Sequence, residues 1–125
     1  MMRGVATLKL IGYWPSGCQS DWPNPADFVD PEWDDQERHM VWTYLKYGII
    51  ARSYRGLSPC RFCHEQNGSM EFTDGVYIWP QGLAHYLDAH AVRLPQQFVT
   101  HAVERLDALE IASVDYDWWK SQERP

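Results

Sequence analysis

Four potential metal ligands occur in the order Cys-Cys-His-His, and their spacing constrains the fold of this chain more than any other sequence feature. The pattern is Cys60-x2-Cys63-x21-His85-x4-His90. Two thiolates and two imidazoles are a common ligand set of tetrahedral zinc. Two cysteines in one loop can turn around an ion, and a hairpin followed by a helix can return two histidines to it. The sequence therefore predicts a Zn²⁺ site held by all four residues.

The spacing differs from that of a DNA-reading ββα zinc finger. Such fingers place about 12 residues between the second cysteine and the first histidine, whereas 21 separate them here, so the likeness lies in ligand order only. Positions five apart on a regular helix point ~140° apart. We therefore expect the helix to end or tighten near His90. His64 is the alternative to one of the histidines, although direct sequence neighbours of a ligand seldom reach the same ion.

Two catalytic interpretations compete with a structural metal. A redox Cys-x-x-Cys pair is typically found at a helix N-terminus, which lowers the thiol pKa, but a polar loop, His-Glu-Gln-Asn-Gly-Ser, follows Cys63. Pro59-Cys60-x-x-Cys63 also matches half of the zinc deaminase signature, yet no His-x-Glu precedes Cys60. Four ligands would close the site, and closed zinc sites are structural. We therefore expect no catalytic residue, with a zinc-dependent hydrolase or deaminase as the less favoured alternative.

The chain length and the positions of proline and glycine, which divide the chain into short elements, indicate a single α+β domain over residues 1–125. Its zinc-binding module is expected at about 58–95. The 125 residues, 45% of them hydrophobic, suffice for one core. The predicted strands cover 5–11, 49–54 and a hairpin over 69–79, and the predicted helices cover 31–47, 81–90 and 95–109. Asp30-Pro31 is a typical helix start. Asp74-Gly75 favours a two-residue type I′ turn in the hairpin.

Helical periodicity predicts which side chains face the core. In the helix at 31–47, one sector contains Trp33, Met40, Val41, Tyr44 and Tyr47, and Trp42 lies on the opposite side. In the helix at 95–109, the apolar sector contains Phe98, Val99, Ala102, Val103, Leu106 and Leu109. His101 and Glu104 lie outside that sector. We expect both to be solvated polar residues.

Charge is segregated along the chain. The net charge of −6 works against general binding to a phosphate backbone. Seven acids and no cation lie between residues 21 and 37, whereas residues 46–61 contain four cations and no acid. Such segregation favours electrostatic steering of a protein partner, and aromatic residues are enriched where partners bind. The predicted partner-binding residues are Trp33, Asp34, Asp35, Trp42, Trp118 and Trp119.

The expected partner is a basic protein, and the expected function is non-enzymatic protein binding by a zinc-stabilised domain. Bacterial immunity proteins that neutralise nucleic-acid-modifying toxins fit this profile by analogy. The alternative is a zinc-finger-like regulator that binds nucleic acid. It would use the cations Lys46, Arg52, Arg55 and Arg61, and it needs them concentrated on one face.

Features that direct a chain to membranes or to an oxidising compartment are weak here. No stretch approaches the ~20 apolar residues of a membrane span, and the first residues lack a secretory signal pattern. The cysteine count is odd, with Cys18 expected to be an unpaired thiol. We therefore expect a cytoplasmic protein.

Residues 60–95 resemble a set of small uncharacterised bacterial proteins. The shared motifs are Cys60-x-x-Cys63, Asn67-Gly68, Thr73-Asp74-Gly75, Trp79-Pro80-Gln81-Gly82-Leu83-Ala84-His85-Tyr86, His90 and Arg93-Leu94-Pro95. The resemblance covers less than a third of the chain. It implies a bacterial zinc-finger-like module and no particular activity.

Overall fold

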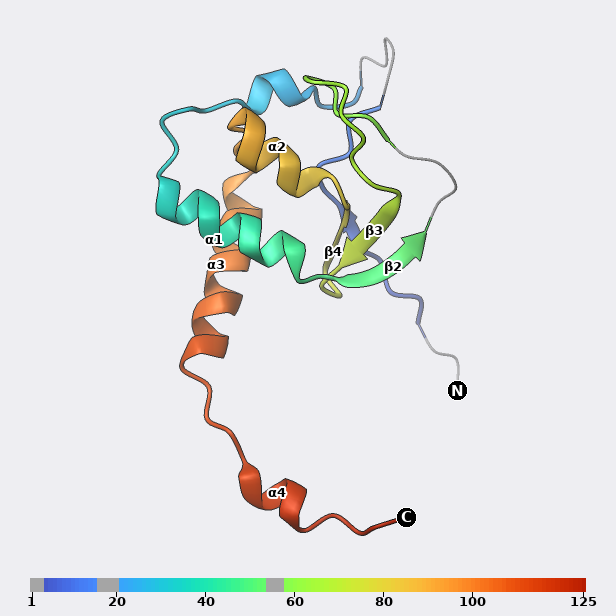
Figure 1. Cartoon of the computed structure of the whole chain (residues 1–125), viewed down its shortest axis with the longest axis vertical. Helices are drawn as coiled ribbons and strands as arrows, with labels where there is room; N and C mark the ends of the chain where they lie inside the picture. Colours follow the sequence, from blue (N-terminus) through green and yellow to red (C-terminus); the bar gives the residue numbers. More distant parts are fainter. Residues whose placement is uncertain (1–3, 16–20, 54–57) are drawn as a thin grey trace.

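A four-stranded sheet with helices packed on one face forms the body of the protein (Figure 1). The computed structural model describes residues 4–15, 21–53 and 58–125. The strands are β1 (Lys9–Leu10), β2 (Ile49–Ser53), β3 (Met70–Thr73) and β4 (Tyr77–Pro80), and the helices are η1 (Pro25–Phe28, 3-10), α1 (Asp35–Lys46), α2 (Leu83–His90), α3 (Gln96–Glu110) and α4 (Tyr116–Lys120). The predicted α+β class is confirmed.

The strand order in the sheet is β1-β4-β3-β2. β3 and β4 form the predicted antiparallel hairpin, with Phe72 opposite Trp79. β2 adds to β3 antiparallel, and β1 adds to β4 parallel. β1 and β2 are therefore the two edges of the sheet.

The core lies between the sheet and helices α1 and α3. Successive strand residues point to opposite faces, so Tyr77 and Trp79 of β4 face the same layer. Phe98 of α3 packs edge-on against both rings, at centroid distances of 4.9 Å and 5.9 Å. The Trp79 indole Nε1 donates to the carbonyl of Leu45 in α1. This bond satisfies the polar atom of a fully buried tryptophan.

Several predicted boundaries were wrong. Only Lys9–Leu10 of the expected strand 5–11 pairs with the sheet. Helix α1 begins at Asp35 rather than at residue 31, because the Asp34 carboxylate accepts from the Glu37 N–H and is the actual N-cap. Residue 54, the last residue of the expected second strand, lies outside the described residues.

The hairpin turn is not the expected two-residue type I′ turn. A type I′ turn needs a positive φ at both central residues. Gly75 has φ +92°, but among the described residues other than glycine only His64 and Ala91 have a positive φ. Instead, the Thr73–Ile78 pair and the bond from the Asp74 N–H to the Tyr77 carbonyl place Gly75 and Val76 at the tip. The Asp74 carboxylate accepts from the N–H groups of Val76 and Tyr77.

Two side chains of the predicted helical core faces are exposed. Leu109 is 72% exposed because α3 extends past the sheet, where no layer is available to cover its last turns (Figure 1). Tyr47 is 82% exposed because it caps the end of α1 instead of continuing the helix. The tail, for which the sequence predicted no element, contains helix α4.

Candidate metal centre

The first two ligands lie in a tight loop before the hairpin. Pro59 and Gln66 form an isolated antiparallel bridge, and the N–H of Cys60 donates to the carbonyl of Glu65 at 2.8 Å. The His64 N–H donates back to the carbonyl of Cys60 at 2.9 Å, with His64 in the left-handed region at φ +61°. These bonds turn the chain so that the thiols of Cys60 and Cys63 lie on the same side of the loop.

The other two ligands lie at the two ends of α2. The helix ends at His90, because Ala91 adopts a left-handed conformation with φ +54° and the Val92 N–H donates to the carbonyl of Tyr86. The expectation that the helix ends near His90 is confirmed. This ending lets two histidines five residues apart face one point, with their ring centroids 5.0 Å apart.

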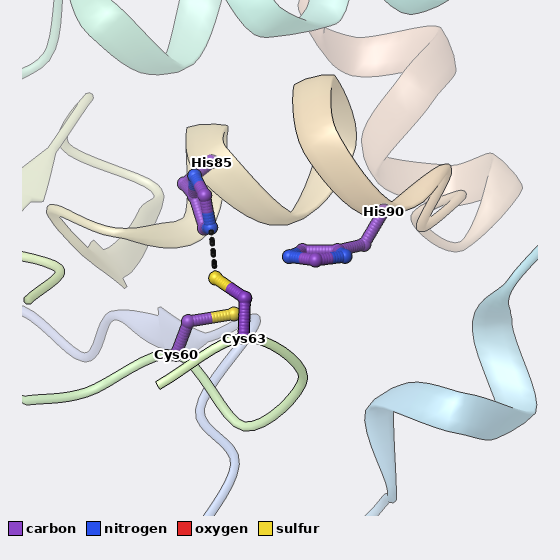
Figure 2. Close-up of side chains that lie close together, drawn as sticks. All are labelled: Cys60, Cys63, His85 and His90. Carbon is purple, nitrogen blue, oxygen red and sulfur yellow. Dashed lines mark hydrogen bonds between the residues drawn. The ribbon is translucent and has the colours of Figure 1, made fainter. Parts of the chain in front are cut away.

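The four side chains converge from the loop and the helix (Figure 2). One ligand atom from each of Cys60, Cys63, His85 and His90 lies within 4.8 Å of all the others. The Cys63 Sγ is 3.3 Å from the His85 Nε2. A tetrahedral ion with bonds of about 2.0–2.3 Å separates its ligands by about 3.3–3.8 Å, so small side-chain movements would complete the shell. His64 is not part of this cluster.

Buried polar atoms in the cluster fit a bound cation. The His90 Nε2 is buried and has no hydrogen-bond partner among the described residues, an arrangement that costs free energy unless something binds it. Cys60 is fully buried and Cys63 is exposed. The N–H of Phe62 lies 3.4 Å from the Cys60 Sγ, and such a donor would offset charge on a metal-bound thiolate. Because Cys63 is the exposed ligand, a metal ion could enter the site from its side.

Electrostatics also disfavours the metal-free cluster. A bond from the backbone of Glu65 favours the Cys63 thiolate, but burial and the neighbouring Cys60 sulfur outweigh it and raise the pKa of Cys63. Two thiolates in one loop repel each other, and a divalent cation removes that repulsion. The donor set and its charge thus both suit a soft or borderline metal ion.

Aromatic and basic side chains hold the loop against α2. The N–H of Arg61 donates to the Tyr86 hydroxyl at 2.8 Å, and the Phe62 ring lies 5.0 Å from that of His90. The Arg61 guanidinium donates to the carbonyls of Trp14 and Pro15. Arg61 therefore holds the ligand loop against the N-terminal segment. These bonds occupy the guanidinium that nucleic-acid binding would need.

The predicted partner-binding residues do not form one surface. Trp33 is 4% exposed, and its indole donates to Glu37, so its assignment to the partner surface was wrong: the residue packs in the core. Asp34 and Asp35 are exposed, and Trp42 is half-buried. Trp118 and Trp119, both well exposed, belong to α4, which Figure 1 shows projecting beyond α3, away from α1.

Both acids at the start of α1 also have local roles. Asp34 is the N-cap, and the Asp35 carboxylate pairs with Arg38 at 3.0 Å. In the same region, Asp30 pairs with Arg93 at 2.9 Å. By contrast, Asp21, Asp27 and Glu32 are exposed and form no side-chain hydrogen bond or ion pair with other described residues.

A second polar cluster was missed by the sequence analysis. His101 is not a solvated residue, because its Nε2 lies 2.7 Å from the Asp74 Oδ2 and its side chain is 21% exposed. The Tyr44 hydroxyl donates to the same Asp74 oxygen. The cluster joins α1, α3 and the hairpin loop. Sequence spacing carries little signal for it, because the three residues come from three different elements.

The chain matches no protein-family model, and no curated protein or solved structure is similar enough to count as a match. None of the helices in the described part of the chain combines the length and the apolarity needed to span a bilayer.

Proposed function

We propose that the protein is a zinc-stabilised, non-enzymatic domain that binds a basic protein partner. The observation that carries the proposal is the convergence of two cysteines and two histidines on one point. Four such ligands complete the shell that zinc prefers, and a shell filled by protein side chains has no position for an activated water. Zinc binding would then contribute folding free energy rather than catalysis.

Exposed charge supports the part of the proposal that concerns a basic protein partner. Residues 21–34 run along one end of the molecule (Figure 1). They contain Asp21, Asp27 and Glu32, which form no ion pair within the described part of the chain. Trp22 is 43% exposed and packs edge-on against Tyr13, which is 46% exposed. Carboxylates beside exposed aromatic rings suit a basic partner with apolar contacts at its centre. In biological terms, the proposal is that the protein neutralises a basic toxin, as immunity proteins do.

The nucleic-acid alternative gains no support from the basic side chains. Arg61 is bonded to the N-terminal segment, and the Lys46 ammonium lies 5.2 Å from the Trp42 ring. Arg55 lies outside the described residues. The described cations therefore do not offer the concentrated face that phosphate binding needs.

Metal analysis tests the zinc part. Purified protein should contain about one zinc per chain by mass spectrometry of the metal. Cys63→Ser should lose most of it. The matched control is His64→Ala, next to the ligand but outside the cluster, which should keep it. Equal metal content in the wild type and in Cys63→Ser would contradict the proposed site.

Charge reversal tests the partner part. A triple variant, Asp21→Lys, Asp27→Lys and Glu32→Lys, should capture less of a basic partner from extracts of the source cells than the wild type does, and should associate more slowly with it. These acids are a better choice than Asp34, whose reversal would also remove a helix cap. A matched control reverses Asp88, an exposed acid on α2. Association that is insensitive both to the triple reversal and to added salt would contradict an electrostatic interface.

A further inference from the structure

Residues 111–125, here called the arm, extend from the end of α3 away from the body of the protein (Figure 1). Every residue of the arm is exposed. Ile111 is 84% exposed, Tyr116 69% and Trp119 73%. From residue 113 onward, the hydrogen bonds of the arm with described residues are all made within the arm, as in the cap from the Asp115 carboxylate to the Trp118 N–H.

We expect an arm of this composition to bind a protein surface. Isolated helices as short as α4 are marginal in water, and contiguous exposed apolar side chains mark interaction sites. Trp118 and Trp119 lie side by side with ring centroids 6.4 Å apart. Tryptophan is the residue type most enriched among the anchors of protein interfaces. The two indoles are therefore the natural anchors of the arm.

Charge restricts what the arm can bind. The arm carries three acids, Asp115, Asp117 and Glu123, and two cations, Lys120 and Arg124. The last turns of α3 before it add Asp107 and Glu110, so residues 106–119 contain four acids and no cation. The complementary surface must therefore combine exposed apolar groups with positive charge.

Such a surface lies on the same chain, at the edge strand β2. The basic strand, defined as residues 46–53, contains two cations and no acid. Ile49 and Ile50 point to opposite faces of the sheet, yet they are 71% and 57% exposed. Neither Lys46 nor Arg52 forms an ion pair with a described residue, although Arg52 lies opposite Glu71 in the ladder. The edge is therefore apolar and basic, whereas the end of α3 and the first part of the arm are apolar and acidic.

We propose that the arm of one copy packs on the basic strand of a second copy, and that the two copies exchange arms reciprocally. Within one copy the two surfaces are separate, because Figure 1 shows α4 well away from β2. A two-fold arrangement covers both surfaces of both copies and closes the assembly. The register shift between Ile50 and Arg52 interrupts the edge, so the contact is made by side chains of α4 rather than by an added strand. This proposal is independent of the metal and of the basic partner.

Sedimentation over a range of concentrations tests the exchange. The wild type should form a dimer that salt weakens. Trp118→Ala with Trp119→Ala should raise the dimer dissociation constant about 30-fold or more. The matched control is Trp22→Ala, another exposed tryptophan outside the arm, which should leave that constant unchanged. A wild type that remains monomeric at all concentrations, or a dimer that the double arm variant leaves intact, would overturn the proposal.

A charge swap identifies the paired surfaces. One variant reverses the acidic stretch (Asp117→Lys in the arm with Glu110→Lys at the end of α3), and the other reverses the basic strand (Lys46→Glu, Arg52→Glu). Each alone should dimerise poorly, because like charges then face each other. A mixture of the two should recover a one-to-one heterodimer, since every remaining contact pairs opposite charges. Failure of the mixture to associate more tightly than either variant alone would show that the arm binds elsewhere. Asp115 stays unchanged because it caps α4.

Discussion

The Nε2 atom of His101 lies 2.7 Å from the Oδ2 atom of Asp74, and this contact joins the middle of α3 to the loop of the β3–β4 hairpin. The Tyr44 hydroxyl of α1 donates to the same carboxylate. Burial raises the pKa of Asp74, but the bonds from Tyr44, from the Tyr77 N–H and from His101 outweigh it and lower that pKa to about 2. Three elements that are distant in the sequence thus meet at one ionised carboxylate.

Asp74→Asn should destabilise the fold at neutral pH by about 1–2 kcal/mol. The folded-state pKa of Asp74, about 2, lies below its ordinary value of 3.8. Its ionisation therefore contributes stability in full at pH 7, and the contribution is lost as the pH falls through the interval from 3.8 to about 2. Urea unfolding at several pH values should show the difference between wild type and variant shrinking over that interval. Asp88→Asn, at an exposed site, is the control and should change little at any pH.

Tyr44→Phe should raise the pKa of Asp74 from about 2 toward its ordinary value, because the carboxylate loses a donor while staying buried. NMR titration of the side-chain carboxyl carbon measures this pKa directly. Tyr47→Phe is the matched control, since Tyr47 is close in sequence and 82% exposed. An unchanged pKa in Tyr44→Phe would mean that the hydroxyl does not bond to Asp74 in solution.

Chelation should lower the melting temperature of zinc-loaded protein. A ligand that binds only the folded state stabilises it by about 2.7 kcal/mol when its free concentration is 100 times its dissociation constant. Exposure of Cys63 leaves the site accessible from one side, so EDTA should act without prior unfolding. Calorimetry should show a drop of several degrees in the wild type and almost none in Cys63→Ser. Equal drops in both proteins would place the responsible metal elsewhere.

Gly48→Ala should destabilise the protein by about 1–3 kcal/mol. Gly48 lies where the chain passes from α1 into β2, and an added Cβ would lie 2.8 Å from the Phe72 Cβ and 2.8 Å from the Trp79 Cζ2. Both neighbours are packed core side chains, so neither can move away freely. Gly4→Ala, where nothing lies within 4 Å, is the control and should be neutral. Thermal unfolding of the two variants checks the difference, and equal stability would show that the turn relaxes.

Spacing and periodicity were sufficient for much of the fold. The dipeptide Asp74-Gly75 between two strand-like runs predicted the hairpin, and the proline and glycine positions predicted helices close to α2 and α3. These signals are local, because each depends on residues a few positions apart. The four ligands could also be named from the sequence, since so few side chains bind a soft metal and their order suits a loop, a hairpin and a helix.

Only the tertiary structure decided where helices lack a covering layer and which polar groups meet. Leu109 continues the apolar stripe of α3, yet it is exposed because the sheet ends before it. Trp33 lies in a segment rich in acids, yet it is buried because the chain before α1 folds back over the core. Tyr44, Asp74 and His101 meet because α1, the hairpin loop and α3 pack together. A local pattern determines which face of an element is apolar, but the length and position of the neighbouring elements determine whether that face is covered.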